Sequence, residues 1–211
     1  MLQCNGISKA YGARRIFNDL NYRLSAGVYA IQGPNGIGKS TLLGIMSGAI
    51  PADAGDISID GISMKASPMQ VRQRLSYVPD ESPVYPFMTG LDLLDFVAMA
   101  KKTRVDTGIM QLVEHFGLTP HLNTRFAVMS LGTQKKFMLC AAWIGEPLAI
   151  FMDEPSNGLD AGARNLLAGM IRQRSKNRLM VFSTHDADFV AACSATVLNI
   201  EQIFKGLARG E

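Results

Sequence analysis

The sequence predicts an α/β fold, in which a mostly parallel sheet is covered by helices and carries a helical insertion. Three observations lead to this prediction. A glycine-rich loop, GPNGIGKST at residues 33–41, follows an apolar run that is typical of a strand. Short apolar runs alternate with helix-like segments, as in parallel sheets that are covered on both faces. Residues 90–145 have an almost entirely helical period, which indicates an insertion into the α/β core.

The individual elements follow from local patterns. Alternating or continuous apolar residues indicate strands, and an Asp-Gly pair at residues 60–61 is typical of a turn that ends one of them. We expect strands at 2–7, 20–32, 56–61, 74–79, 148–152, 179–183 and 195–200. We expect helices at 39–48 and 68–74, through 90–145, and between the last three strands.

Composition excludes several classes of protein. The chain has 211 residues, enough for one large domain or a core with one insertion. Its 21 basic and 18 acidic residues give a net charge of +3, which is too weak to indicate nucleic-acid binding. The apolar runs are much shorter than the ~20 residues of a membrane span. The N-terminal stretch lacks the pattern of a signal peptide, so we expect a soluble protein.

Isolated cysteines and lysine pairs suggest no separate site. Cys4, Cys140 and Cys193 are far apart and form no CxxC pair, so neither a disulfide framework nor a zinc site is indicated. We expect each to be a small buried apolar residue. The pairs Lys101-Lys102 and Lys135-Lys136 are expected to be solvated helix faces.

The glycine-rich loop predicts a nucleotide site with magnesium. It matches G-x-x-x-x-G-K-[ST] between a strand and a helix, which is the context that supports such a match. Glycines allow successive N–H groups to point at a phosphate, and the following helix adds its positive dipole end. Lys39 is expected to reach the outer phosphates and Ser40 to bind Mg²⁺. The candidate residues are Gly33, Pro34, Asn35, Gly36, Ile37, Gly38, Lys39, Ser40 and Thr41.

Two carboxylates end the apolar run LAIFM at residues 148–152. Such carboxylates face the ligand crevice of a parallel sheet. Asp153 is therefore a candidate magnesium ligand, and Glu154 a candidate to orient or deprotonate an attacking water. The alternative is a solvated turn before Pro155. His185 follows another expected strand at the same sheet edge, so it is a candidate contact to the γ-phosphate, although a lone histidine is more often structural.

Together these motifs resemble the ATP-binding subunits of ABC transporters. GPNGIGKST is similar to the family's Walker A motif, LAIFMDE to Walker B, SNGLD at 156–160 to the D-loop and His185 to the switch histidine. The resemblance implies a P-loop NTPase core with a mostly parallel sheet, an N-terminal antiparallel β part and a helical insertion that carries the signature motif. It implies one ABC ATPase domain, with residues 1–80 and 146–211 as the core and 81–145 as the inserted helical subdomain.

The segment MSLGTQKK at 129–136 resembles the family's signature motif, usually Leu-Ser-Gly-Gly-Gln. Met129, Leu131 and Thr133 depart from that motif, whereas Ser130 and Gly132 keep it. In the family this motif closes over the γ-phosphate that a second subunit binds. The resemblance therefore implies a homodimer, or a heterodimer with a second ABC ATPase subunit. The simpler alternative is that Ser130 only caps a helix.

Two further positions follow from the resemblance. Tyr11 lies where the family has an aromatic residue that stacks on adenine, the alternative being an ordinary strand-edge tyrosine. Asp80 lies where a glutamine usually contacts magnesium, and it could bind the ion directly or hold a water. We also hypothesise that Tyr85, Phe87 and Met88 line the groove that receives the membrane subunit, the alternative being that they cover the core.

The function implied is that of an ATPase subunit, using ATP and Mg²⁺, that drives transport through a separate integral-membrane permease. The Ser-Leu-Gly variant resembles the ABC-2-type exporters, which favours export. We expect a cytoplasmic protein, peripheral on the inner face of the cell membrane, that does not bind nucleic acid. Two alternatives stay open: a soluble ABC-type ATPase in cofactor or complex assembly, and a nucleotide-binding regulator that no longer hydrolyses ATP.

Overall fold

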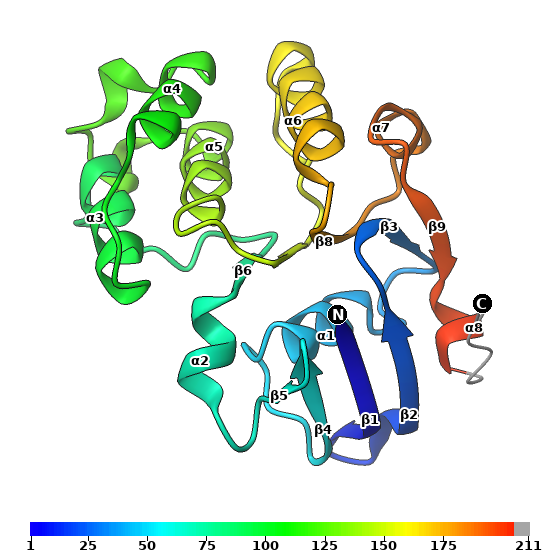
Figure 1. Cartoon of the computed structure of the whole chain (residues 1–211). Helices are drawn as coiled ribbons and strands as arrows, with labels where there is room; N and C mark the ends of the chain where they lie inside the picture. The colour runs from blue at the N-terminus through cyan, green and yellow to red at the C-terminus, as the bar shows by residue number, and fades with distance from the viewer. Residues whose placement is uncertain (205–211) are drawn as a thin grey trace.

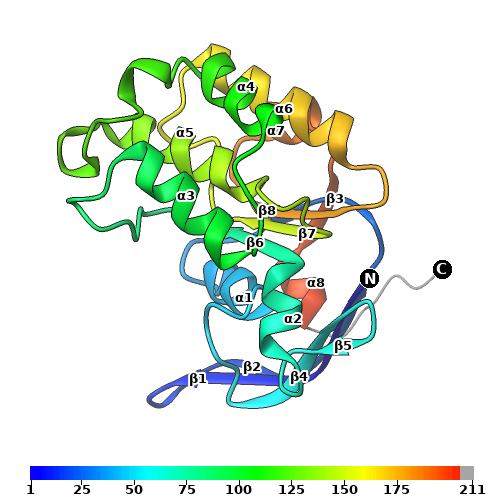
Figure 2. The ribbon, with the colours of Figure 1, turned by 60° about the vertical axis from the view of Figure 1, so that its left-hand side comes forward.

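The computed structural model describes residues 1–204, which form two sheets on either side of a first helix, with further helices beyond the second sheet (Figures 1 and 2). The predicted core extends to residue 211, and its last residues, 205–211, lie outside the described part of the chain. The observed arrangement confirms the predicted α/β class.

The N-terminal part of the chain forms an antiparallel sheet. Its strands are β1 (Leu2–Tyr11), β2 (Arg14–Leu24), β4 (Ala54–Ile59) and β5 (Ile62–Ser63), in the order β2-β1-β4-β5. The pairs β1–β2, β1–β4 and β4–β5 are all antiparallel. The antiparallel β part implied by the family resemblance is thus confirmed. The first strand is longer than the predicted range 2–7.

The second sheet is parallel and carries the phosphate loop. Its strands are β6 (Leu75–Val78), β7 (Ala149–Met152), β8 (Leu179–Ser183), β3 (Gly27–Gln32) and β9 (Thr196–Asn199), in that spatial order. Every neighbouring pair is parallel. The predicted strand 20–32 is divided, because the chain leaves one sheet at Leu24 and enters the other at Gly27. The predicted strand 195–200 ends at Asn199, and α8 (Ile200–Phe204) begins there.

Side chains of the parallel strands alternate between two hydrophobic cores. In β7, Ile150 and Met152 point to the outer helices, whereas Ala149 and Phe151 belong to the core that lies between the two sheets. All four are almost completely buried. Successive residues of a strand point to opposite faces, and both faces of this strand are buried. Its sequence is therefore a continuous apolar run, which is why the strand could be predicted.

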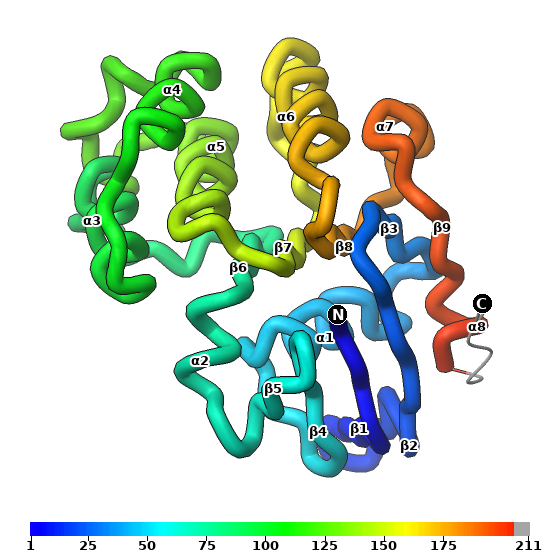
Figure 3. Tube along the Cα trace, viewed as in Figure 1, coloured from blue at the N-terminus to red at the C-terminus, as the bar shows by residue number. Residues whose placement is uncertain are grey.

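The helices divide between the two faces. Helix α1 (Lys39–Met46) contributes to the core between the sheets, and α2 (Pro68–Gln73) leads into β6. Helices α3 (Gly90–Ala100), α4 (Thr107–His115) and α5 (Leu131–Ala142) interrupt the chain between the adjacent strands β6 and β7 (Figure 3). Helices α6 (Ala161–Arg174) and α7 (Ala187–Ala192) follow β7 and β8.

The helical block between residues 90 and 145 is less continuous than predicted. Loops and two short 3₁₀ turns, Thr119–His121 and Phe126–Val128, separate its three α-helices. Helices α3 and α4 both pack against α5. The three cysteines are free and buried, as expected, and burial raises the pKa of each thiol to about 12.

Candidate active site

The phosphate loop joins β3 to α1, and its backbone has the conformation that the sequence predicts. Gly36 and Gly38 have φ values of 72° and 120°, in the left-handed region where a side chain would be strained. Helices α3 to α7 each begin with a side chain that accepts a hydrogen bond from a first-turn N–H. Helix α1 has no such cap and no acidic residue in its first turn. Its N–H groups therefore remain available to an anion.

Lys39 lies over this loop and is 8% exposed. Its ammonium donates hydrogen bonds to the carbonyl oxygens of Gly33, at 2.8 Å, and Pro34, at 3.2 Å. It also lies 3.1 Å from Nε2 of His185. Phosphate oxygens would replace weaker neutral acceptors around an ammonium that is already held in place.

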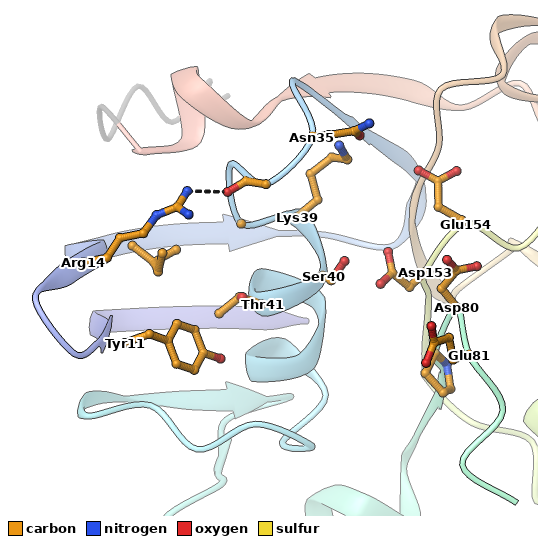
Figure 4. A pocket seen from close by; sticks show the side chains of 14 residues that line it. Tyr11, Arg14, Asn35, Lys39, Ser40, Thr41, Asp80, Glu81, Asp153 and Glu154 are labelled. Atoms are coloured by element: carbon orange, nitrogen blue, oxygen red, sulfur yellow. Dashed lines mark hydrogen bonds between the residues drawn. The ribbon is translucent and has the colours of Figure 1, made fainter.

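A cavity of about 700 Å³ opens beside the loop (Figure 4). Such a volume is within the usual range for small-molecule sites. The predicted residues that line it are Tyr11, Asn35, Gly36, Gly38, Lys39, Ser40, Thr41, Asp80, Asp153 and Glu154. The structure therefore brings together residues from the antiparallel sheet, the phosphate loop and the ends of β6 and β7.

Four residues that were not predicted from the sequence also line this cavity: Arg14, Ile16, Pro79 and Glu81. Arg14 donates a hydrogen bond of 2.6 Å to the carbonyl of Gly36, so it supports the loop from the antiparallel sheet. Tyr11 is 50% exposed at the end of β1, with the Lys9 ammonium 5.2 Å from its ring centre. An exposed aromatic face in a cavity is available for stacking.

The acidic strand end is held by a buried serine. The hydroxyl of Ser183, at the end of β8, donates to Oδ1 of Asp153 and accepts a hydrogen bond of 3.0 Å from the backbone N–H of Glu154. Ser183 is fully buried and Asp153 is 5% exposed. One hydroxyl thus fixes both the carboxylate of Asp153 and the backbone of Glu154. Ser183 was not among the residues predicted from the sequence.

Glu154 has the geometry and the charge environment of a candidate base. Its φ of 42° places it in the left-handed region, which costs about 1 kcal/mol for a residue other than glycine. Burial is the main cause that raises the pKa of its carboxyl group, and the negative charge of Asp153 adds to this. His185 and Lys39 act in the opposite direction. A raised pKa makes a carboxylate a better proton acceptor near neutral pH.

His185 lines a second cavity of about 580 Å³, which adjoins the first because Asn35, Asp80 and Glu154 line both. Its Nε2 atom lies 3.7 Å from Oε1 of Glu154. Residues 156–158 of the predicted D-loop also line this second cavity. The histidine therefore lies beside the phosphate loop and the acidic strand end, as its position after β8 predicts.

The donor set at this edge suits magnesium that arrives with phosphates. Within residues 1–204, no group of three or more His, Cys, Asp or Glu is arranged to hold a metal by itself. The Ser40 hydroxyl and the carboxylates of Asp80 and Asp153 nevertheless line one cavity. Oxygen donors in small number, completed by substrate phosphates, are what Mg²⁺ prefers. The residues present thus fit this ion.

The signature segment does not line the cavity of its own chain. Ser130 caps α5, because its hydroxyl oxygen accepts a hydrogen bond of 3.1 Å from the N–H of Thr133. A side chain at Gly132 would place its Cβ atom 2.6 Å from the carbonyl oxygen of Gly158 in the D-loop. Leu131 and Val128 are 80% and 76% exposed. The cap is therefore present, and beside it lies an exposed apolar surface.

Two of the three residues predicted to line a groove for the membrane subunit, Tyr85 and Phe87, are exposed, and that hypothesis stays a prediction. A cavity of about 280 Å³ near this segment is lined by Pro83, Val84 and residues of β6, α3 and α5, and not by Tyr85, Phe87 or Met88. Tyr85 and Phe87 stack on each other with ring centres 5.5 Å apart. Both are about two-thirds exposed, so they do not cover the core.

Within the described residues, none of the helices is long and apolar enough to cross a bilayer.

Comparisons with known proteins agree with these motifs. A sequence profile described as ABC transporter matches residues 17–157. The linearmycin resistance ATP-binding protein LnrL of Bacillus subtilis is 30% identical over 193 residues, which cover 87% of this chain and 60% of LnrL. The Nod factor export ATP-binding protein I of Rhizobium etli is 31% identical over 184 residues, which cover 85% of this chain and 58% of that protein. The chain thus spans about three fifths of the length of these relatives.

Solved structures give the same result at the level of the fold. The structure of an ATP-binding subunit of an ABC transporter has a TM-score of 0.82 at 26% identity, over 94% of this chain and 86% of that chain. The dimeric structure of MJ0796, a bacterial ABC transporter cassette, has a TM-score of 0.83 at 19% identity, over 94% of each chain. The second likeness concerns the fold alone.

Proposed function

Because the chain belongs to the ABC transporter family, we propose that it is the ATP-binding and ATP-hydrolysing subunit of a transporter that exports its substrate through a separate membrane permease. One observation carries this proposal: a single cavity brings together the Lys39 ammonium, the Ser40 hydroxyl and the carboxylates of Asp153 and Glu154. The names of the relatives, which refer to resistance and export, support the direction of transport.

The phosphate loop and Lys39 bind the phosphates of ATP. The uncapped N–H groups of α1 and the ammonium of Lys39 converge on the cavity, so they balance phosphate charge without a large rearrangement. Tyr11 offers its exposed ring to the adenine. Ser40 and Asp153, with Asp80 near them, would hold Mg²⁺, which supplies neutralisation of the phosphate charge.

Glu154 accepts a proton from a water molecule that attacks the γ-phosphorus. The oxygen of the water forms a bond to phosphorus, and the bond from phosphorus to the bridging oxygen breaks to give ADP and phosphate. The raised pKa of Glu154 favours this role. His185 is close enough to Lys39 and Glu154 to contact the γ-phosphate and hold it during the reaction.

The active form is a dimer in which the signature segment of one subunit covers ATP bound by the other. Ser130 and Gly132 do not line the cavity of their own chain, and the exposed Leu131 and Val128 lie beside them. Binding of ATP favours the closed pair because both subunits contact it, and hydrolysis removes that preference. A permease that is docked on the pair would respond to this cycle at the inner face of the membrane.

The test is size-exclusion chromatography of Glu154→Gln with ATP and with ADP. Loss of the base should trap a dimer with ATP alone, and hydrolysis should fall by at least about a hundredfold. The control is Glu146→Gln, which changes an exposed glutamate that is also in the left-handed region. ATP turnover that persists in Glu154→Gln, or a monomer that does not bind ATP, would contradict the proposal.

Association with a permease needs a separate measurement. Co-expression with the neighbouring genes should recover the chain in the membrane fraction, and washing with ADP should not release it. Recovery of an ATP-hydrolysing chain only in the soluble fraction, despite expression of the neighbouring membrane protein, would favour a soluble assembly ATPase instead.

A further inference from the structure

Lys135 is a buried cation that the proposed mechanism does not use. It lies early in α5, five residues after Ser130, and is 4% exposed. Its ammonium donates hydrogen bonds of 3.1 Å to the carbonyl oxygens of Pro79, Asp80 and Asp153. An ammonium has three donors, so these three carbonyls use all of them.

The three carbonyls belong to two separate segments. Pro79 and Asp80 directly follow β6, and Asp153 directly follows β7. The same two segments carry the carboxylates of Asp80, Asp153 and Glu154 into the nucleotide cavity. One side chain of the signature helix is therefore bonded to the backbone of both acidic segments.

A charge contact accompanies these hydrogen bonds. Oδ1 of Asp80 lies 3.5 Å from the Lys135 ammonium, and the Asp80 side chain is 48% exposed and lines both cavities. Burial lowers the pKa of Lys135, and the negative charge of Asp80 is the first of the effects that oppose this. A buried ammonium is costly without a counter-charge. Asp80 thus faces Lys135 on one side and the nucleotide cavity on the other.

We propose that Lys135 is a positioning residue that fixes the signature helix α5 relative to the acidic strand ends, and that Asp80 links this contact to nucleotide. A ligand that draws the Asp80 carboxylate into the cavity weakens the counter-charge at Lys135, while the three carbonyls keep the ammonium in place. The position of Ser130 then depends on what Asp80 binds. This second part of the proposal rests on the proposed function, whereas the first part concerns the chain without nucleotide.

The first test needs no nucleotide. Hydrogen exchange is compared for the parent chain, Lys135→Met and the control Lys136→Met. Lys136 is the next residue of the same helix, and it pairs with exposed Asp160 instead. In Lys135→Met the non-proline amides of residues 80–84 and 153–158 should exchange about tenfold faster, because their tether to α5 is lost. Equal exchange in the two variants would overturn the positioning role.

The second test uses ATP-dependent dimerisation in the Glu154→Gln background. Lys135→Met should weaken the dimer by about tenfold or more and change ATP affinity of the monomer by less than about threefold. Lys135→Arg keeps the positive charge but presents its donors in a planar fork, so it should restore part of the dimer that Lys135→Met loses. A merely structural role would lower ATP affinity and the melting temperature together and leave no selective loss of the dimer.

The single variant Asp80→Asn tests the charge contact in a chain that keeps Lys135. It should weaken the dimer by itself, and it should have a much smaller effect when Lys135→Met is already present, because the two side chains act through one contact. Independent effects would overturn the link between Asp80 and Lys135. If Glu154→Gln neither binds ATP nor dimerises, the proposed function fails, and hydrogen exchange still decides the positioning role.

Discussion

Replacement of Ser183 by alanine tests the assembly of the acidic strand end most directly. The fully buried hydroxyl of Ser183, at the end of β8, donates to the carboxylate of Asp153 and accepts a hydrogen bond from the N–H of Glu154. A hydrogen bond to a charged group contributes about 1.5–3 kcal/mol, and a neutral one contributes about 1 kcal/mol. Ser183→Ala should therefore lower the free energy of unfolding by about 2–4 kcal/mol.

For a chain of this length, about 1 kcal/mol corresponds to roughly 2–4 °C in melting temperature. We expect a fall of about 5–15 °C, measured by calorimetry. The rate constant of ATP hydrolysis should fall by about 10- to 100-fold, because Glu154 loses the partner of its backbone and Asp153 turns more freely. ATP affinity, which depends mainly on the phosphate loop, should change by less than about threefold.

The matched control is Ser47→Ala. Ser47 is also a buried serine, but its hydroxyl makes a single hydrogen bond, to the carbonyl of Gly44 within α1. It should lose about 1 kcal/mol of stability and keep its rate of hydrolysis. A Ser183→Ala variant with a wild-type rate, or with a loss no larger than that of Ser47→Ala, would refute the assigned role of this hydroxyl.

Three further predictions concern charge and packing. Glu154→Gln should raise the free energy of unfolding at neutral pH, because burial raises the pKa of Glu154 and makes its charged form costly. Thermal unfolding measured across a pH series should show that this gain disappears near pH 4, where the carboxyl group is protonated in both states. A gain that does not change with pH would contradict this prediction. Lys101→Met should stabilise the fold by about 1–3 kcal/mol at pH 7, because burial lowers the pKa of Lys101 to about 8. Denaturant unfolding should show that this gain falls between about pH 8 and pH 10.5, where the unfolded chain binds the proton and the folded chain does not. Gly132→Ala should weaken ATP-dependent dimerisation, because the added Cβ atom would lie 2.6 Å from the carbonyl oxygen of Gly158. The control is Gly169→Ala on α6, where an added Cβ atom would meet no atom within 4 Å. This control should leave the dimer unchanged and add a few tenths to about 1 kcal/mol of stability.

Local patterns were sufficient wherever one segment determines its own geometry. The glycines of residues 33–38 dictate a loop that exposes N–H groups, and the apolar run at 148–152 dictates a buried strand with carboxylates at its end. Because ligands bind at the carboxyl ends of parallel strands, the strand assignment alone placed Asp153, Glu154 and His185 on one edge of the sheet. The antiparallel part and the dimer came from the family resemblance instead.

Contacts between distant segments were not predictable in this way. Ser183 was visible as the last residue of a strand, but its bonds to Asp153 and Glu154 depend on β7 and β8 being neighbours. Arg14 reaches Gly36 only because β2 passes beside the phosphate loop. The sequence did not show that Tyr85 and Phe87 stack on each other, nor that Pro83 and Val84 line the cavity beside them. In each case the missing information was which segments pack together.

In each of the two lysine pairs, one lysine is buried or partly buried, although the sequence suggested that both are solvated. Consecutive residues of a helix point about 100° apart, so a pair cannot face solvent equally once one side of the helix packs. Lys136 points to exposed Asp160, whereas Lys135 enters the space between α5 and the strand ends. Just beyond the end of α3, Lys101 is partly buried and donates to Ser76, while Lys102 is exposed. The expectation of solvated faces is thus wrong for one member of each pair. Because a buried ammonium needs its donors satisfied and its charge balanced, each such lysine must be bonded to particular atoms of another segment. For Lys135 those atoms belong to the segments that carry the carboxylates of the candidate active site.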